Sequence, residues 1–391
     1  MKRIKENARY LEIRNEYDVA VVGGGVAGAA AAISAARNNA KVCLIERYCA
    51  IGGLATLGNV NVYLPLCDGK GNKIITGIAE EFMKLSILDG YGKIPECWLN
   101  NNFEECKRVR LKVEFNPWTF AIELEKLLID EGVEILYDTR FSDVIKEGNK
   151  ITHLIFEDKK GRFAIKSKVV VDASGDADVC VCAGEKVVSV DTNVACGWFF
   201  CFDGEKVKRY VFSQKYDHFN RQVYDLNTGF SIEQTTQQIL SSRENISKII
   251  EKMKNENSRI LPVSLPSIPT FRMTRRLKGL IELEESHEKT LFSDAVGMFG
   301  DWRKSGPVYY MPFSALYAVR TSNLITAGRC ISACSAWDII RAIPVCALTG
   351  EIAGTASALL CRSKSKRFSS LDIRKLQQTL KNQGVKVDEK I

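Results

Sequence analysis

The hydrophobic and polar positions near the N-terminus follow the pattern of a β-α-β unit. Tyr17–Val22 is a β-branched, apolar run that stops at three consecutive glycines, and it predicts a buried parallel strand. The alanine-rich run Val26–Ala36 contains no proline and predicts a helix. Lys41–Ile45 returns to strand character and is followed by Glu46. These segments together predict a β-α-β unit within about thirty residues.

The pattern weakens after this unit and then recovers. Glycine, proline and asparagine interrupt the chain up to about residue 114, which predicts loops around one short helix at 78–86. Further helices are expected at 118–129, 232–255 and 344–360, and strands at 133–137, 141–146, 151–157, 162–166, 168–172, 197–202 and 323–326. The pattern changes character at residue 185. We therefore expect a discontinuous first domain of residues 1–184 and 315–391, interrupted by a second domain of residues 185–314.

The composition is that of an ordinary globular protein, with 46% apolar and 26% charged residues in a chain of 391. No apolar run approaches the roughly 20 residues that span a bilayer, so we expect no membrane helix. The first 18 residues lack the apolar core of a signal peptide, which favours the cytoplasm. The 13 cysteines are scattered and odd in number, and there are only three histidines. We therefore expect reduced cysteines and no structural metal site.

The net charge of +8 is dispersed along the chain without a polybasic block. Such a charge suits an anionic cofactor or substrate, and it also suits simple solubility. On its own this charge is weak evidence for nucleic acid, and we expect neither a nucleic-acid nor a membrane partner.

The strongest chemical signal is a GxGxxG sequence between the first predicted strand and helix. Gly23 makes a tight turn, Gly25 lets the backbone approach a pyrophosphate, and Gly28 permits close helix packing. The helix N-terminus offers N–H groups to phosphates, and Glu46 can accept hydrogen bonds from ribose hydroxyls. A purely structural glycine turn is the alternative. The fingerprint predicts dinucleotide binding but leaves FAD and NAD open.

Several motifs far apart in the sequence appear in a familiar order. They are Gly23–Gly28 with Glu46, Ile51–Thr56, Val169–Asp178, Leu324–Ser332, Ile340–Pro344 and Gly350–Gly354. Together they resemble the FAD-dependent oxidoreductase family related to the glutathione reductase type, and more distantly the fumarate reductase flavoproteins. The resemblance implies FAD as the cofactor. It also implies an α/β fold, with a three-layer Rossmann-type FAD-binding domain and an inserted mixed α+β domain that caps the flavin and binds substrate.

The resemblance assigns cofactor-binding roles to residues in four places along the chain. The first two groups are the β-α-β unit and the turn after it, namely Gly23, Gly25, Val26, Ala27, Gly28, Glu46, Arg47, Gly52, Gly53, Leu54 and Thr56. The other two are a strand end and a C-terminal turn with its helix, namely Ala173, Ser174, Gly175, Gly328, Arg329 and Pro344. Many relatives carry an aspartate where this chain has Arg329, and the resemblance then implies a contact of Arg329 with a phosphate or ribityl oxygen of the cofactor. Gly350 and Gly354 are interpreted as sites of helix packing.

Candidate catalytic residues are harder to select. Arg341 precedes the helix that should face the flavin, and its planar fork suits a substrate carboxylate or phosphate. Arg275, in a cluster with Arg272 and Arg276, could do the same, and Tyr310 could exchange a proton. An ordinary ion pair is the alternative for each arginine. Cys330 is interpreted as an inert buried thiol.

The absent motifs also narrow the function. The chain has no CxxxxC after Gly53, no second GxGxxG and no four cysteines at iron–sulfur spacing. We therefore expect an FAD-dependent oxidoreductase that transfers a hydride between a small organic substrate and flavin N5, with a separate electron donor or acceptor. The alternatives are a flavin-dependent tRNA-modifying enzyme and a non-catalytic FAD-binding subunit. Assembly into a homo-oligomer is left open.

Overall fold

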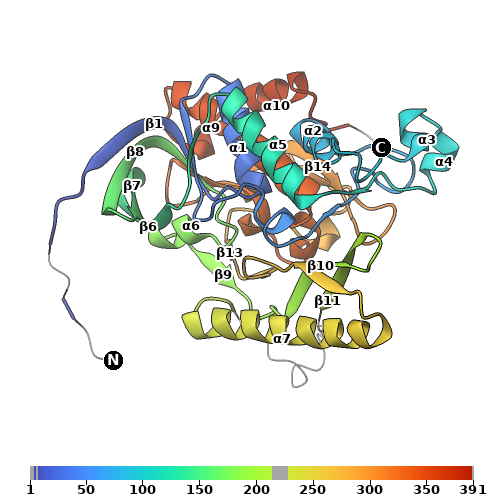
Figure 1. Cartoon of the computed structure of the whole chain (residues 1–391). Coiled ribbons are helices and arrows are strands. Elements are labelled where there is room, and N and C mark those ends of the chain that lie inside the picture. The colour runs from blue at the N-terminus through green and yellow to red at the C-terminus, as the bar shows by residue number, and fades with distance from the viewer. Residues whose placement is uncertain (1–3, 6–7, 214–227, 390–391) are drawn as a thin grey trace.

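The computed structural model describes residues 4–5, 8–213 and 228–389, and a seven-stranded sheet lies at its centre (Figure 1). Four parallel strands lie side by side in the order β5 (Glu134–Leu136), β2 (Val42–Ile45), β1 (Ile13–Val22) and β8 (Gly161–Asp172). On the far edge of β8, residues 161–166 pair antiparallel with β7 (Lys150–Asp158), which pairs with β6 (Arg140–Glu147). Residues 170–172 of β8 pair parallel with β16 (Leu324–Thr326). The two strands predicted at 162–166 and 168–172 are therefore one continuous strand, which pairs with β1 along one edge and with β7 and β16 along the other.

The two faces of the sheet pack against different layers because side chains alternate along each strand. Val19 and Val21 of β1 point into the main core. That core is shared with α1 (Val26–Arg37), α5 (Pro117–Asp130) and α9 (Ile343–Arg362). Ala20 and Val22 point the other way, toward the antiparallel strands and α6 (Asp178–Cys182). The predicted three-layer α/β fold is confirmed.

Helix α9 is long and apolar enough to cross a membrane by length and composition alone. Most of its apolar stretch is buried inside the protein, where it packs in the main core. Within the described residues it is the only helix of that kind. Its apolar composition is therefore explained by its place as a core helix.

A smaller three-stranded antiparallel sheet lies apart from the central one. Its strands are β11 (Val207–Ser213), β10 (Cys196–Phe202) and β12 (Leu261–Ser264), and the long helix α7 (Ile232–Glu256) packs on it (Figure 1). Phe199 and Cys201 form a separate small core there with Ile246, Ile250 and Ile260. These elements all belong to the segment predicted as the inserted domain.

The hairpin of β14 (Ala295–Gly300) and β15 (Val308–Pro312) behaves differently from the rest of that segment. Val296, Phe299, Tyr309 and Met311 are part of the main core, so the hairpin packs with the first domain. The division of the chain into domains therefore stays a prediction, and its second boundary, at residue 314, crosses a packed core.

The remaining elements are short or lie at the periphery. They are β3 (Val62–Tyr63), α2 (Ile78–Leu85), α3 (Glu96–Leu99), α4 (Phe103–Cys106), β4 (Val113–Glu114), β9 (Val187–Ser189), β13 (Arg275–Leu277), α8 (Trp337–Ile340) and α10 (Ile373–Asn382). Short 3₁₀ turns occur at Gly53–Ala55, Glu285–His287, Phe313–Ala315, Gly328–Cys330 and Phe368–Ser370. The sequence did not predict the helices α3, α4, α6, α8 and α10.

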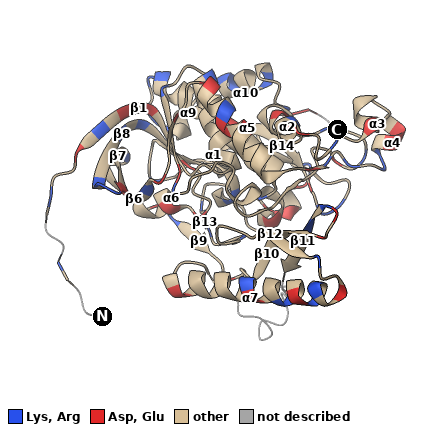
Figure 2. Cartoon of the chain, viewed as in Figure 1, with Lys and Arg blue, Asp and Glu red and all other residues tan. Residues whose placement is uncertain are grey.

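Charged residues are dispersed over the described part of the protein, and Figure 2 shows both signs interspersed along α7. This helix carries four basic and four acidic side chains, the first at Glu233 and the last at Glu256. Such a pattern is typical of a solvated helix face and does not form a continuous basic stripe.

Candidate functional site

The glycine-rich segment between β1 and α1 packs closely at Gly23 and Gly28 and borders open space at Gly25. A Cβ on Gly23 would lie 2.4 Å from the carbonyl oxygen of Ala173, and one on Gly28 would lie 1.8 Å from that of Gly23. A Cβ on Gly25 would meet no atom within 4 Å. Gly23 and Gly28 are therefore required by packing, whereas Gly25 borders open space at the N-terminus of α1.

The Glu46 carboxylate is held by the backbone around it. One oxygen accepts the N–H of Gly24 at 2.7 Å, and the other accepts that of Tyr48 at 2.8 Å. Burial raises the Glu46 pKa above its ordinary value, although both N–H groups act to lower it. The neighbouring Arg47 places its guanidinium 4.5 Å from the centre of the Tyr48 ring. Glu46 is thus oriented before any ligand arrives.

A second glycine turn lies against the first. The N–H of Gly52 donates to the carbonyl of Gly24 at 2.8 Å, and a Cβ on Gly53 would lie 3.2 Å from the Cα of Gly25. Both Gly52 and Gly53 have positive φ, at 107° and 57°. The Thr56 hydroxyl donates to the Ile51 carbonyl at 2.7 Å, which closes the turn that contains Leu54. Thr56 therefore shapes this turn rather than offering its proton outward.

The end of β8 forms the third side of the site. The Ser174 hydroxyl donates to Asp172 at 2.6 Å and accepts the N–H of Asp178 at 3.0 Å. Gly175 has φ +85°, and a Cβ there would lie 2.9 Å from the Arg329 guanidinium carbon. Ala173, Ser174 and Gly175 thus form a compact turn between Gly23 and Arg329.

Arg329 lies in the turn after β16. Its guanidinium donates to Asp176 at 2.9 Å, and its buried Nε has no hydrogen-bond partner among the described residues. Burial acts to lower the Arg329 pKa, but Asp176 outweighs it and the net shift is upward. The preceding Gly328, with φ +81°, sits where a Cβ would lie 2.9 Å from that of Ala27.

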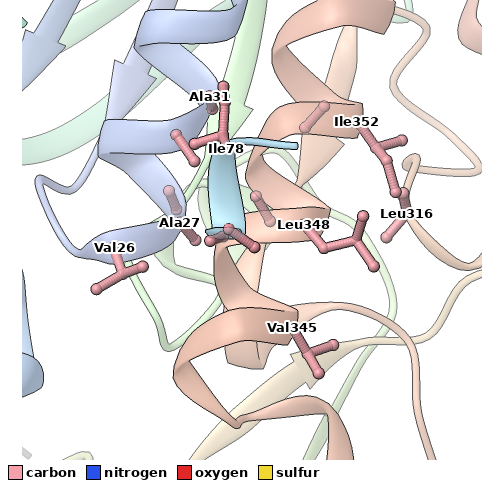
Figure 3. Close-up of a cluster of buried hydrophobic side chains, with 14 of the residues drawn as sticks. Val26, Ala27, Ala31, Ile78, Leu316, Val345, Leu348 and Ile352 are labelled. Carbon is pink, nitrogen blue, oxygen red and sulfur yellow. The ribbon is translucent and has the colours of Figure 1, made fainter. Parts of the chain in front are cut away.

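Helices α1 and α9 run in the same direction through the core. Figure 3 shows them together, with Ala27 and Ala31 on α1 and Leu348 and Ile352 on α9. A Cβ on Gly350 would lie 2.2 Å from the carbonyl oxygen of Ala27, and one on Gly354 would lie 2.2 Å from that of Ala31. The predicted packing role of these two glycines is confirmed.

This parallel arrangement brings the two helix N-termini to one edge of the sheet. Pro344, in the first turn of α9, lies at the same end of the helix pair as Gly25. Each N-terminus carries unpaired N–H groups and a partial positive charge. The edge therefore favours a ligand with negative charge at two separated positions.

Comparison with known proteins decides the family. The model of the family described as FAD dependent oxidoreductase matches residues 18–197 and 202–380. The chain belongs to that family. No curated protein matches the sequence.

Solved structures show the fold shared with other flavoenzymes. A p-nitrophenol 4-monooxygenase from Pseudomonas putida DLL-E4 is 12% identical with a TM-score of 0.52, covering 97% of this chain and 91% of its own. A geranylgeranyl bacteriochlorophyll reductase-like protein from Thermoplasma acidophilum is 13% identical with a TM-score of 0.46, covering 94% and 84%. At 12% identity the likeness to the monooxygenase shows the fold alone.

The protein is thus an enzyme of the FAD-dependent oxidoreductases, and its site fits FAD. The open space at Gly25 would admit a pyrophosphate, which a side chain there would fill. The unpartnered Nε of Arg329 offers a donor beside Asp176. When bound, FAD supplies the electron chemistry that protein side chains cannot.

Two of the three predicted catalytic residues border this site, and both are already paired. Arg275 donates to the Asp176 carbonyl at 2.8 Å and to the Asp178 carboxylate at 2.7 Å. Burial raises the Asp178 pKa to about 6, with Asp176 adding to the shift. Arg341, directly before α9, donates through Nε to Asp338 at 2.8 Å. Asp176 therefore joins Arg275 to Arg329, a link that sequence reasoning missed although Asp176 lies inside a recognised motif.

Tyr310 lies in different surroundings. Its hydroxyl donates to the carbonyl of Glu389 at 2.9 Å, and its ring packs in a small cluster with Ile74, Met298 and Val308. None of these contacts is a predicted cofactor or catalytic residue. Within the described part of the chain, these contacts do not join Tyr310 to Arg275 or Arg341, and its catalytic role stays a prediction.

Cys330 is fully buried beside the site. Its thiol donates to the carbonyl of Asp172 at 3.4 Å, and burial raises its pKa well above the ordinary value. A thiol in this state is a poor nucleophile. The interpretation of Cys330 as an inert buried residue agrees with its surroundings.

Proposed function

We propose that this enzyme transfers a hydride between a small organic substrate and N5 of its flavin. The observation that carries the proposal is the parallel packing of α1 and α9, which aims two positive helix ends at one edge of the sheet. One end suits the pyrophosphate. The other lies next to Gly328 and suits the negative charge that a flavin ring gains on reduction.

Each part of the site would then hold a different part of the cofactor. The turn at Gly25 would bind the pyrophosphate, and Glu46 would accept hydrogen bonds from the adenosine ribose. Arg329, anchored by Asp176, would donate to a phosphate or ribityl oxygen. These roles need no rearrangement of the Glu46 side chain, because the backbone N–H groups of Gly24 and Tyr48 already hold its carboxylate in place.

The substrate would lie on the side of the flavin that the arginines border. Arg341 is a candidate because it lies two residues before the start of α9 and donates two hydrogen bonds to one oxygen of Asp338. A substrate carboxylate or phosphate could accept hydrogen bonds from the guanidinium N–H groups that do not donate to Asp338. Arg275, bound to Asp176 and Asp178, would act mainly by positioning Asp176 against Arg329.

The two alternative functions receive less support. The tRNA-modifying alternative calls for a continuous basic stripe on the capping elements, whereas α7 alternates basic and acidic residues. The non-catalytic alternative conflicts with membership of an oxidoreductase family. We also propose a relationship to the glutathione reductase type, a cytoplasmic location, and a separate electron donor or acceptor.

An anaerobic reduction assay tests the proposal. The FAD-loaded enzyme would be mixed with single metabolites under exclusion of oxygen, with loss of flavin absorbance as the readout. We expect bleaching by at least one metabolite, and a deuterium isotope effect when its transferred hydrogen is replaced. Bleaching without any isotope effect, at a rate set by electron transfer alone, would argue against hydride transfer.

A further inference from the structure

A cavity of about 430 Å³ lies away from the flavin site, between α2, the α3–α4 segment and the C-terminal residues. None of the residues that line it has a predicted role in cofactor binding or catalysis. Its volume falls in the range of small-molecule sites, which is about 300–1,000 Å³. The family function leaves this cavity without an explanation.

Part of the cavity lining is apolar. Met83 and Leu111 are almost completely buried and form part of its lining. Trp98 donates its indole N–H to the carbonyl of Val109 at 2.7 Å. The hydrogen-bond donor of this side chain is therefore satisfied, and its ring faces can pack against an apolar ligand. Leu99 and Phe103 also line the cavity while remaining 62% and 49% exposed. Covering such side chains with an apolar ligand body would be favourable by about 25 cal/mol per Å².

The polar part of the lining is mainly basic. Three lysines from three separate segments, Lys73, Lys84 and Lys386, reach the cavity together with one acid, Glu80. Glu80 is shared, because Lys73 and Lys84 each donate to it at 2.9 Å. Each of these ammonium groups therefore keeps donors for another acceptor. Lys386 pairs with Glu389 at 2.8 Å, and Glu389 is not among the residues that line the cavity.

We propose that this cavity is a binding site for a small amphipathic anion, with an acidic head group held by the lysines and an apolar body lying against Trp98 and Phe103. The charge surplus around Glu80 selects the head group, and the apolar lining selects the body. A cationic amphipath would meet the lysines without compensation. A small polar anion would leave the exposed Leu99 and Phe103 uncovered.

The proposal goes beyond the flavin chemistry and does not depend on it. The test therefore uses the FAD-loaded protein, so that the flavin site is filled, and measures binding by calorimetry. Decanoate serves as the probe, and decanol and decylamine serve as matched ligands of the same chain length. We expect decanoate to bind at a single site at least about tenfold more tightly than decanol, which corresponds to about 1.4 kcal/mol. Decylamine should bind more weakly than both.

Two variants assign the binding to this cavity. The double variant Lys73→Gln/Lys84→Gln should remove the preference for decanoate over decanol, and Phe103→Ala should weaken both ligands equally. Lys375→Gln, on the exposed surface of α10, is the control and should change the affinity for neither decanoate nor decanol. Equal binding of decanoate and decylamine, absence of binding, or decanoate binding unaffected by the double variant would each overturn the proposal. If the double variant does not fold, the comparison of the three ligands on the unmodified protein and on Phe103→Ala decides the question.

Discussion

The Glu46 carboxylate, which follows β2, accepts the backbone N–H of Gly24 at 2.7 Å. The acid at the end of β2 is thereby fixed to the glycine-rich turn between β1 and α1. Two parts of the fingerprint that are 22 residues apart in sequence form one rigid unit. A ribose can then be bound without the entropy loss of ordering a free side chain.

Replacing Glu46 should weaken FAD binding without unfolding the protein. In Glu46→Gln, the amide group would face one of the two backbone donors, and the charge-assisted acceptors for the ribose would be lost. We expect FAD affinity to fall at least about tenfold, or about 1.4 kcal/mol. Flavin fluorescence titration of the apo-protein measures this. Glu123→Gln on α5 is the control, and equal affinities of the two variants would contradict the role of Glu46.

Alanine substitutions at Gly25 and Gly28 should have different effects on stability and on FAD binding. Gly28→Ala puts a Cβ 1.8 Å from the carbonyl oxygen of Gly23, so we expect a loss of stability of about 2 kcal/mol or more. Gly25→Ala meets no atom, and its φ of −65° suits alanine, so the fold should be retained. FAD binding should nevertheless fall, because the Cβ enters the cofactor space. Urea unfolding and FAD titration separate the two effects, and a Gly25→Ala protein with full affinity would refute the assignment of this space.

Glu351 should make stability depend on pH. It is buried in α9 and accepts the N–H of Ile78 at 2.9 Å, and burial raises its pKa from 4.5 to about 8. Because the folded state holds this proton more tightly than the unfolded state, stability from this group is complete below pH 4.5 and declines as the pH rises to about 8.

The variant Glu351→Gln isolates that contribution. Glutamine can still accept from Ile78 but cannot ionise, so the variant should lose this part of the pH dependence. We expect it to gain at least about 1.4 kcal/mol relative to the unmodified protein between pH 5 and pH 8.5, the value of one pKa unit. Urea unfolding at the two pH values measures this, and parallel pH profiles of the two proteins would rule the explanation out.

Arg329 should be needed for cofactor binding as well as for local structure. Arg329→Lys can keep the ion pair with Asp176, but it loses the second edge of the guanidinium that faces the site. We expect weaker FAD binding, by roughly fivefold to tenfold, about 1 to 1.4 kcal/mol, with little change in the unfolding midpoint. Arg320→Lys, whose guanidinium donates to the carbonyl of Gly184 and lies exposed, is the control. A large fall in stability with unchanged FAD affinity would show a purely structural role.

Much of the fold follows from local patterns in the sequence. The helices α1, α5, α7 and α9 are found within one or two residues of their predicted ends, because their apolar pattern is long. Strand β1 ends where predicted but begins four residues earlier, at Ile13 instead of Tyr17. Helices α3 and α4 are too short, at four residues each, to show a period. The hairpin β14–β15 could not be assigned to the main core from sequence, since its burial is decided by contacts with α9.

The candidate site follows from the sequence to a similar extent. Gly23 and Gly28 can be recognised from the sequence because only glycine tolerates the close backbone approach at those two positions. Gly25 can be recognised because a side chain there would enter the space expected for the pyrophosphate. The pairing of Arg275, Asp176 and Arg329 does not, because it joins three segments through side-chain bonds that no spacing rule encodes. The prediction for Tyr310 rests on the chemistry of its side chain alone. Its position depends on β15, where Tyr309 packs in the main core and the next residue, Tyr310, packs in a separate cluster.

The most direct test of the central claim is an absorption spectrum of the purified protein, followed by titration of any apo-protein with FAD. The account predicts flavin bands from tightly held FAD, or uptake of added FAD to a stoichiometric end point, and loss of that uptake when Gly25 is replaced by tryptophan. A folded protein that shows no flavin bands and takes up no FAD would contradict it.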